Sequence, residues 1–288
     1  MHASLSRLLE LLDLEQLEVN LFRGQNPLGT RRRIFGGQVL AQALVAAVRT
    51  VEGRLAHSLH AYFLRPGDSR IPTVFEVDRV RDGGSFTTRV VKAIQRGEAI
   101  LEMSVSFQVE CGGLEHQIER PPDLRDPSGE LYEDELRRDV ERIGFTPPDG
   151  DLLFDPPVEV RTIGGVRMFD ASTRPPTSNT WIRARGALPD DPSIHQGVLA
   201  YASDMTLLST AANPHPVAIS SREVQSATLD HSIWFHRPFR ADEWLLYVQE
   251  SPVSARSRAF CRGTVFTREG LLVASVAQEG LLRLRSRP

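Results

Sequence analysis

The sequence GQVLAQALV at residues 37–45 recurs in the second half of the chain as QGVLAYASD at residues 196–204. Each copy leads to a strand-like segment with a similar ending, YFLRP at residues 62–66 and WFHRP at residues 234–238. A helix that is apolar on nearly all sides is normally enclosed by the rest of the protein. The sequence therefore predicts two related halves, each built around one buried helix.

Segments with the alternation typical of β-strands follow each helix. In the first half they lie at residues 57–65, 73–81, 85–95 and 99–109, with a hairpin turn at Arg96–Glu98. The second half repeats the hairpin with residues 258–267 and 271–284. This order predicts an α+β fold in which two curved antiparallel sheets each wrap around a long central helix. Pairing the sheets edge to edge would remove two exposed edges and give a pseudo-dimer within one chain.

The chain has 288 residues, which suits two domains of typical size, about 100–150 residues each. An amphipathic helix is expected at residues 4–15, and prolines between Pro121 and Pro157 interrupt a charged stretch. We expect a first domain at residues 1–111, a linker at residues 112–155 and a second domain at residues 156–288.

The composition excludes several classes of protein. The formal net charge is -3, which gives no reason to expect nucleic-acid binding. Cys111 and Cys261 are too few for a disulfide framework and badly spaced for a metal site, so we expect neither, and we expect a reducing compartment, the cytoplasm. No run approaches the roughly 18 to 20 apolar residues that would cross a bilayer, so no membrane span is expected.

The two halves differ in polarity at three matching places. Aligning the helices and the strands that follow them sets Val45 opposite Asp204, Ala56 opposite Thr228, and Ser106 opposite Gln278. Each polar residue has an ordinary structural explanation, such as a polar stripe on a helix or a strand side chain that faces water. Burying an ionised carboxylate without partners is nevertheless expensive, so Asp204 among apolar helical neighbours should have compensating contacts.

A carboxylate, a hydroxyl and an amide could together hold one water molecule. Asp204 would act as the general base, while Thr228 and Gln278 would fix the orientation of the water. The helix N-terminus near Gly197 could supply backbone N–H groups for an oxyanion, and a glycine there permits close approach of a ligand. The trio suits acyl hydrolysis, although the spacing of the three residues is not a motif by itself.

Five longer motifs carry a resemblance to a known family. They are FGGQVLAQA (35–43), HSLHAYFLRPGD (57–68), DGGSF (82–86), LDHSIWFH (229–236) and AQEGLLR (277–283). These motifs resemble the acyl-CoA thioesterase II family, and the likeness covers roughly residues 5–110 and 160–285.

The resemblance implies a double hot-dog fold and hydrolysis of acyl-CoA thioesters to free fatty acid and CoA, without a metal, a cofactor or a covalent acyl-enzyme. In that family an Asp, a Ser or Thr, and a Gln orient the attacking water, and these positions match Asp204, Thr228 and Gln278. The family also forms dimers or tetramers, so a homodimer or homotetramer is expected.

Further candidates for substrate binding are weaker. His60 is the histidine expected to line the acyl-CoA cleft, whereas a strand histidine such as His57, His231 or His236 is more often packed or exposed than catalytic. Arginine pairs well with phosphates, so Arg31, Arg256 and Arg258 are candidates for the phosphates of CoA, although basic runs usually form only a solvated face.

Two other functions remain open from the residues. An enoyl-CoA hydratase or dehydratase on the same fold would need an Asp and a His together at the cleft, and the helix after Gly197 offers no such histidine. A non-catalytic acyl-CoA-binding protein with a degenerate site is the other alternative. Acyl-chain length is not readable from the sequence.

Overall fold

The computed structural model describes residues 2–26, 32–121, 155–165 and 171–285, together with residues 127, 134, 137, 138 and 141. Its helices are α1 (Ala3–Leu12), α2 (Gly36–Val48), α4 (Pro192–Ser203) and the short 3-10 helix η1 (Leu208–Ala212). None of the helices in this part of the chain is long and apolar enough to cross a membrane. The linker expected at residues 112–155 lies largely outside the described residues.

The strands of the first half are β1 (Glu15–Glu18), β2 (Leu21–Gly24), β3 (Leu55–Phe63), β4 (Thr73–Asp82), β5 (Phe86–Gln95) and β6 (Glu98–Gln108). Those of the second half are β7 (Val158–Thr162), β8 (Thr177–Ala184), β9 (Val224–Thr228), β10 (Asp230–Phe235), β11 (Leu245–Ala255), β12 (Arg258–Thr267) and β13 (Leu272–Leu284). They form one sheet in the order β1-β2-β4-β5-β6-β3-β10-β13-β12-β11-β8-β7, and β9 also pairs with β13.

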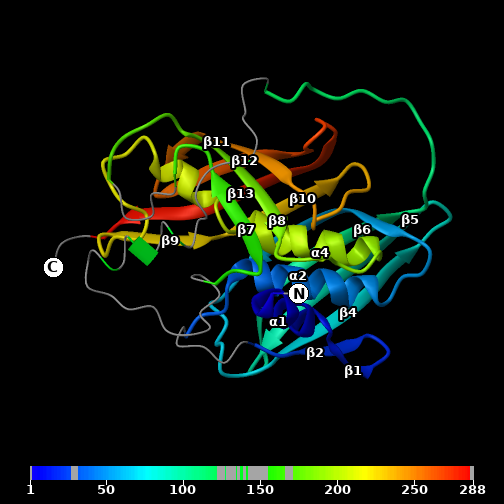
Figure 1. Ribbon diagram of the computed structural model, residues 1–288. Coiled ribbons are helices and arrows are strands. Elements are labelled where there is room, and N and C mark those ends of the chain that lie inside the picture. Colours follow the sequence, from blue (N-terminus) through cyan, green and yellow to red (C-terminus); the bar gives the residue numbers. More distant parts are fainter. Residues whose placement is uncertain are drawn as a thin grey trace.

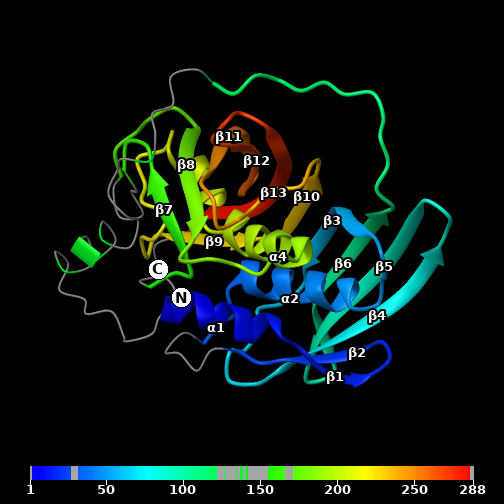
Figure 2. The ribbon, with the colours of Figure 1, turned by 45° about the vertical axis from the view of Figure 1, so that its right-hand side comes forward.

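The two halves join where β3 pairs antiparallel with β10, with Leu59 opposite Ile233. This pairing confirms the continuous sheet and the pseudo-dimer that the repeat predicts. It also places the two apolar helices, α2 and α4, side by side against the sheet (Figure 1, Figure 2).

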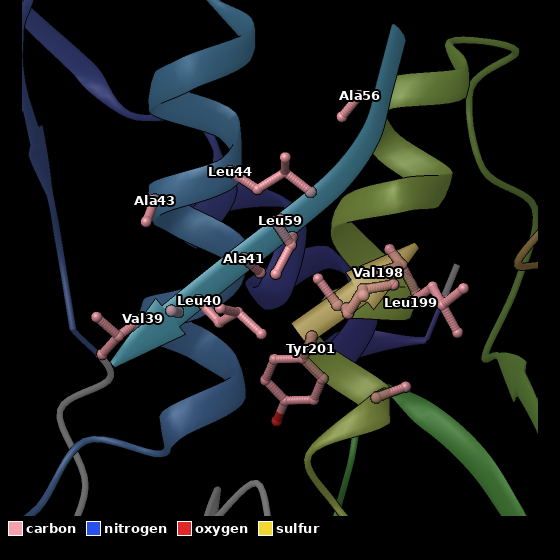
Figure 3. Close-up of a cluster of buried hydrophobic side chains, with 14 of the residues drawn as sticks. Val39, Leu40, Ala41, Ala43, Leu44, Ala56, Leu59, Val198, Leu199 and Tyr201 are labelled. Atoms are coloured by element: carbon pink, nitrogen blue, oxygen red, sulfur yellow. The ribbon is translucent and has the colours of Figure 1, made fainter. Parts of the chain in front are cut away.

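The core consists of the residues that the repeated helix contributes, together with inward residues of the central strands. Figure 3 shows α2 side chains such as Leu44 beside Leu59 of β3, with Val198, Leu199 and Tyr201 of α4 nearby. All of these residues are buried. The amphipathic helix α1 packs Leu5 and Leu8 onto this core, which explains its apolar periodicity.

Helix α4 begins before the repeated stretch at residues 196–204 and ends one residue before Asp204. It begins after Asp191, whose carboxylate accepts a hydrogen bond from the backbone N–H of Ser193 at 2.9 Å, and Pro192 occupies its first turn. It ends at Ser203, so Asp204 is the residue that caps its C-terminus. The matching residue Val45 lies inside α2, so the second half breaks its helix near the polar residue.

One of the three matches between the halves is wrong by one residue. Arg89 of β5 lies opposite Val105, and the corresponding residue Cys261 of β12 lies opposite Gln278. Val105 and Gln278 both face inward, whereas Ser106 faces away and its hydroxyl lies 2.8 Å from Nε2 of His57. The connection between β12 and β13 is longer than that between β5 and β6, which shifts the register relative to simple counting. The counterpart of Gln278 is therefore Val105.

In the first half, a buried arginine lies next to the C-terminal end of α2. The Arg89 side chain is 2% exposed and donates from Nε to the Thr50 hydroxyl at 2.9 Å. Its Nη2 donates to the Thr50 carbonyl at 3.2 Å and to the Asp82 carboxylate at 2.7 Å. Buried charges are tolerated only with such partners.

Replacing Arg89 by Met should lower the free energy of unfolding by about 3 kcal/mol, because a buried carbonyl and a carboxylate lose their donors. Chemical denaturation monitored by circular dichroism measures this loss. Lys92→Met, at an exposed position on the same strand, is the matched control and should change stability by less than about 0.5 kcal/mol. Equal stability of the two variants would contradict the structural role of Arg89.

Candidate active site

The structure brings together the three polar residues that distinguish the second half. The Thr228 hydroxyl donates to Oδ1 of Asp204 at 3.0 Å, and Nε2 of Gln278 donates to the same oxygen at 3.2 Å. Nε2 of Gln278 also donates to the Thr228 hydroxyl oxygen at 2.9 Å. Asp204 comes from the end of α4, Thr228 from the end of β9 and Gln278 from the middle of β13. Positions 74 residues apart in sequence therefore form one hydrogen-bonded cluster.

The start of α2, from the first half, lies against the Asp204 carboxylate. A Cβ atom added to Gly36 would lie 2.6 Å from Oδ2 of Asp204, so only glycine leaves room there. The backbone N–H of Gly37 also donates a hydrogen bond to this carboxylate. The first N–H groups of a helix lack helical acceptors and carry partial positive charge, so they favour a carboxylate nearby.

Burial raises the pKa of Asp204 to about 6. The hydrogen bonds from Thr228, Gly37 and Gln278 act in the opposite direction, because they stabilise the ionised form. The result is a carboxylate that is ionised at neutral pH yet basic enough to accept a proton. General bases work best when the pKa lies near the operating pH.

A buried histidine lies behind Gln278. Nδ1 of His231 is 3.1 Å from Oε1 of Gln278, and Nε2 of His231 is 2.9 Å from the Ser203 hydroxyl. Burial lowers the pKa of His231 to about 4, so the ring is neutral at neutral pH. The sequence favours a packed or exposed His231 over a catalytic one, but it does not predict this contact with Gln278; the place of His231 on the strand that continues from Thr228 was the available signal.

A cavity of about 260 Å³ opens beside Asp204. Its walls include Met205 and Leu208 from the segment after α4, Ser226 from β9, and Ile163, Val217 and Ile219. Polar and apolar side chains both line it. The carboxylate cluster is therefore next to a space that can hold part of a ligand.

Among the described residues, the matching place in the first half carries no such cluster. Val45, Ala56 and Val105 stand at the positions of Asp204, Thr228 and Gln278, and the side chain of Gln196 donates to the Ala56 carbonyl at 2.7 Å. Gly197 lies on this side too, because a Cβ added to it would be 3.8 Å from Val45 and 3.6 Å from Leu12. The helix start that faces Asp204 is thus Gly36–Gly37 of α2, whereas Gly197 lies inside α4, which begins at Pro192, and not at a helix start as expected.

The other predicted binding residues are not part of the cluster. His60 projects from the outer face of β3, where Nδ1 lies 3.1 Å from the Ser232 hydroxyl, because its neighbours Leu59 and Ala61 occupy the inner face. It does not line the cavity beside Asp204, which corrects the place expected for it.

The basic candidates lie at the surface or outside the described residues. Arg256 sits in the tight turn between β11 and β12 with a φ of 52°, and Nε of Arg258 donates to the Glu279 carboxylate at 2.9 Å. Neither lines the cavity beside Asp204. Arg31 lies outside the described residues.

Comparisons with known proteins identify the family. Residues 155–281 match the family model described as acyl-CoA thioesterase, and residues 25–108 match the model described as acyl-CoA thioesterase N-terminal domain. The chain is 38% identical to acyl-CoA thioesterase 2 of Haemophilus influenzae, over 97% of this chain and 98% of that protein.

Solved structures show the same architecture. A crystal structure of an acyl-CoA thioesterase II from Mycobacterium marinum has a TM-score of 0.79 and 42% identity, covering 98% of this chain and all of that one. A protein with a hot-dog fold from Alicyclobacillus acidocaldarius has a TM-score of 0.76 at 21% identity, covering 99% of this chain. These likenesses confirm the double hot-dog fold, and the chain belongs to the acyl-CoA thioesterase family.

Proposed function

We propose that this protein hydrolyses acyl-CoA thioesters to a free fatty acid and CoA, with Asp204 as the general base. The observation that carries this proposal is the Asp204 carboxylate, held by Thr228 and Gln278 beside a cavity, in a chain of the acyl-CoA thioesterase family.

In this mechanism, Asp204 takes a proton from a water molecule as the water oxygen attacks the thioester carbonyl carbon. The carbonyl oxygen then carries the negative charge, and the N-terminal turn of α2 near Gly36 is the candidate donor group for it. When the tetrahedral intermediate collapses, the carbon–sulfur bond breaks and Asp204 returns the proton to the leaving sulfur. Thr228 and Gln278 hold the carboxylate and the water in position, which requires no covalent acyl-enzyme.

The two halves have different tasks in this proposal. The unit at residues 156–288 supplies Asp204, Thr228 and Gln278, while the unit at residues 1–111 acts as scaffold and contributes the start of α2. Residues 112–155 connect them. The cavity beside Asp204 would take the acyl chain, and Arg256, Arg258 and Arg31 remain candidates for the CoA phosphates.

The protein is also proposed to act as a homodimer or homotetramer in the cytoplasm. Tyr62 is 65% exposed and Trp234 is 37% exposed on the outer face of the two central strands, a place where a second copy could pack. Cys111 and Cys261 are both free thiols, which suits a reducing compartment.

A hydratase or dehydratase activity is less well supported. His231 is the histidine near Asp204, but it is fully buried and contacts the far side of the Gln278 amide. Incubation with crotonyl-CoA distinguishes the two activities, because hydration without release of thiol would favour the hydratase. Intact acyl-CoA recovered from folded, ligand-bound protein would instead indicate a binding protein.

The activity should depend on ionisation of Asp204. Because the base works only when deprotonated, kcat/KM is expected to be constant well above pH 6 and to fall about tenfold per pH unit below it. Carbon-13 NMR of the carboxyl group should give the same pKa, about 6. Thr228→Val should raise this pKa because it removes a donor to the ionised form, whereas Thr228→Ser should leave it in place. A profile without this acidic limb would contradict the assignment.

Asp204→Asn should leave the fold intact and reduce kcat for acyl-CoA hydrolysis by about 100-fold or more, because the general base is lost. Release of thiol from a panel of CoA esters of graded chain length measures this effect and identifies the preferred acyl chain. Adding Val45→Asp to this variant should not restore turnover, because Ala56 and Val105 cannot complete a second site. Near-normal turnover of Asp204→Asn would contradict the proposed mechanism.

Gly36→Ala should reduce kcat by about tenfold or more, because the new Cβ would lie 2.6 Å from Oδ2 of Asp204 and displace the carboxylate. Gly84→Ala is the matched control, since nothing lies within 4 Å of a Cβ added there, and its turnover should equal that of the unchanged protein. Thiol release and circular dichroism separate a displaced base from a loss of fold. Equal turnover of the two variants would show that hydrolysis does not depend on the space that Gly36 leaves for the Asp204 carboxylate.

A further inference from the structure

The proposed mechanism assigns no role to His231, although its side chain is fully buried beside the active cluster. A buried polar ring is costly unless its nitrogen atoms have partners. Both have one here, because Nδ1 contacts Oε1 of Gln278 and Nε2 contacts the hydroxyl of Ser203. The ring therefore links the end of helix α4 to the amide of Gln278.

The orientation of the Gln278 amide decides whether the active cluster can form. Its Nε2 has two hydrogens, and both have acceptors, Oδ1 of Asp204 and the hydroxyl oxygen of Thr228. If the amide were turned by 180°, its oxygen would face an ionised carboxylate. Among the residues that the structure describes, the other side-chain contact of the amide is the one between Oε1 and Nδ1 of His231 at 3.1 Å, and this contact opposes the turn.

We propose that His231 is a positioning residue for the hydrolysis proposed above, and that it fixes the Gln278 amide by donating a hydrogen bond from Nδ1 to Oε1. With the proton on Nδ1, the neutral ring must accept at Nε2, and the Ser203 hydroxyl is its donor. Each group then donates to the next: Ser203 to His231, His231 to Gln278, and Gln278 to the Asp204 carboxylate.

The other tautomer would break this order. A ring with its proton on Nε2 would donate to Ser203, whose hydroxyl could then donate to the Ala200 carbonyl at 3.0 Å. Nδ1 would carry a bare lone pair against Oε1 of Gln278, which places two acceptors in contact at 3.1 Å. Relief of that contact requires the amide to turn, which would take the donor away from Asp204 and Thr228.

The first half shows what this part of the fold contains when no chemistry is required. Leu59 lies opposite Val105 on the paired strands, as His231 lies beside Gln278, and the helix alignment sets Leu44 at the place of Ser203. All three counterparts are fully buried apolar residues, and Figure 3 shows Leu44 next to Leu59. Packing alone is thus satisfied by leucine and valine, so the polar chain in the second half needs another reason.

Two substitutions of His231 separate its nitrogen atoms. Asparagine places its amide nitrogen close to the position of Nδ1, whereas glutamine places its amide close to that of Nε2. His231→Gln is expected to lower kcat about tenfold with little change in KM, because a buried hydrogen bond that orients Gln278 is lost. His231→Asn should recover most of that loss. Equal loss in both variants would overturn the proposal.

A double-mutant cycle tests whether His231 acts through Gln278. In a Gln278→Ala background, His231→Gln should cause no further loss of kcat, because the amide that it orients is absent. A further tenfold loss in that background would contradict the proposal. Thermal unfolding of each variant shows whether the fold is kept, and His231→Leu, which copies the residue of the first half, should also remain folded with kcat reduced about tenfold.

NMR of the unchanged protein gives a test that does not rely on any variant. Nitrogen-15 labelling of histidine should show His231 as the neutral tautomer protonated at Nδ1, and the Nε2 tautomer would overturn the proposal. Its failure is distinct from failure of the proposed function. If Asp204→Asn abolishes thiol release but the His231 tests fail, only the positioning role is wrong; if Asp204→Asn retains activity, the function itself is wrong.

Discussion

Pairing of β3 with β10 is the interaction on which the rest of the structure depends. It joins the two halves into one sheet and sets α2 beside α4, so that the start of one helix meets the end of the other. This arrangement brings Gly36 and Gly37 of the first half against the Asp204 carboxylate of the second. The candidate active site is therefore a product of the seam between the halves, although most of its side chains come from the second.

Burial of Asp204 links stability to chemistry. Removing a carboxylate from water raises its pKa. Three hydrogen-bond donors stabilise the ionised form and so limit this rise. The donors also limit where the carboxylate can point, because Oδ1 receives two of them. A group that was merely buried would be neutral, and one that was merely exposed would be a weak base, so the observed balance is what base catalysis requires.

The sequence predicts the fold well because periodicity and repetition are local signals. The repeated helix and the alternating strands predict two sheets joined edge to edge, and the polar differences between the repeats identify Asp204, Thr228 and Gln278. The register of β13 was not predictable by counting, because the turn before β13 is longer than the turn before β6. The counterpart of Gln278 is therefore Val105 and not Ser106. The contact between Gly36 and Asp204 joins the two halves, so no pattern within either half could show it. His60 was misplaced because strand alternation sends it to the outer face.

The candidate active site lies in one of the two similar halves, which fixes the number of such sites per chain at one among the described residues. Under the proposed mechanism, an assembly of n such chains has n reaction centres and not 2n. Near the corresponding place, the first half holds instead a buried arginine, Arg89, with Thr50 and Asp82 as its partners. Under the proposed mechanism, the second half carries the reacting groups and the first half supports them structurally.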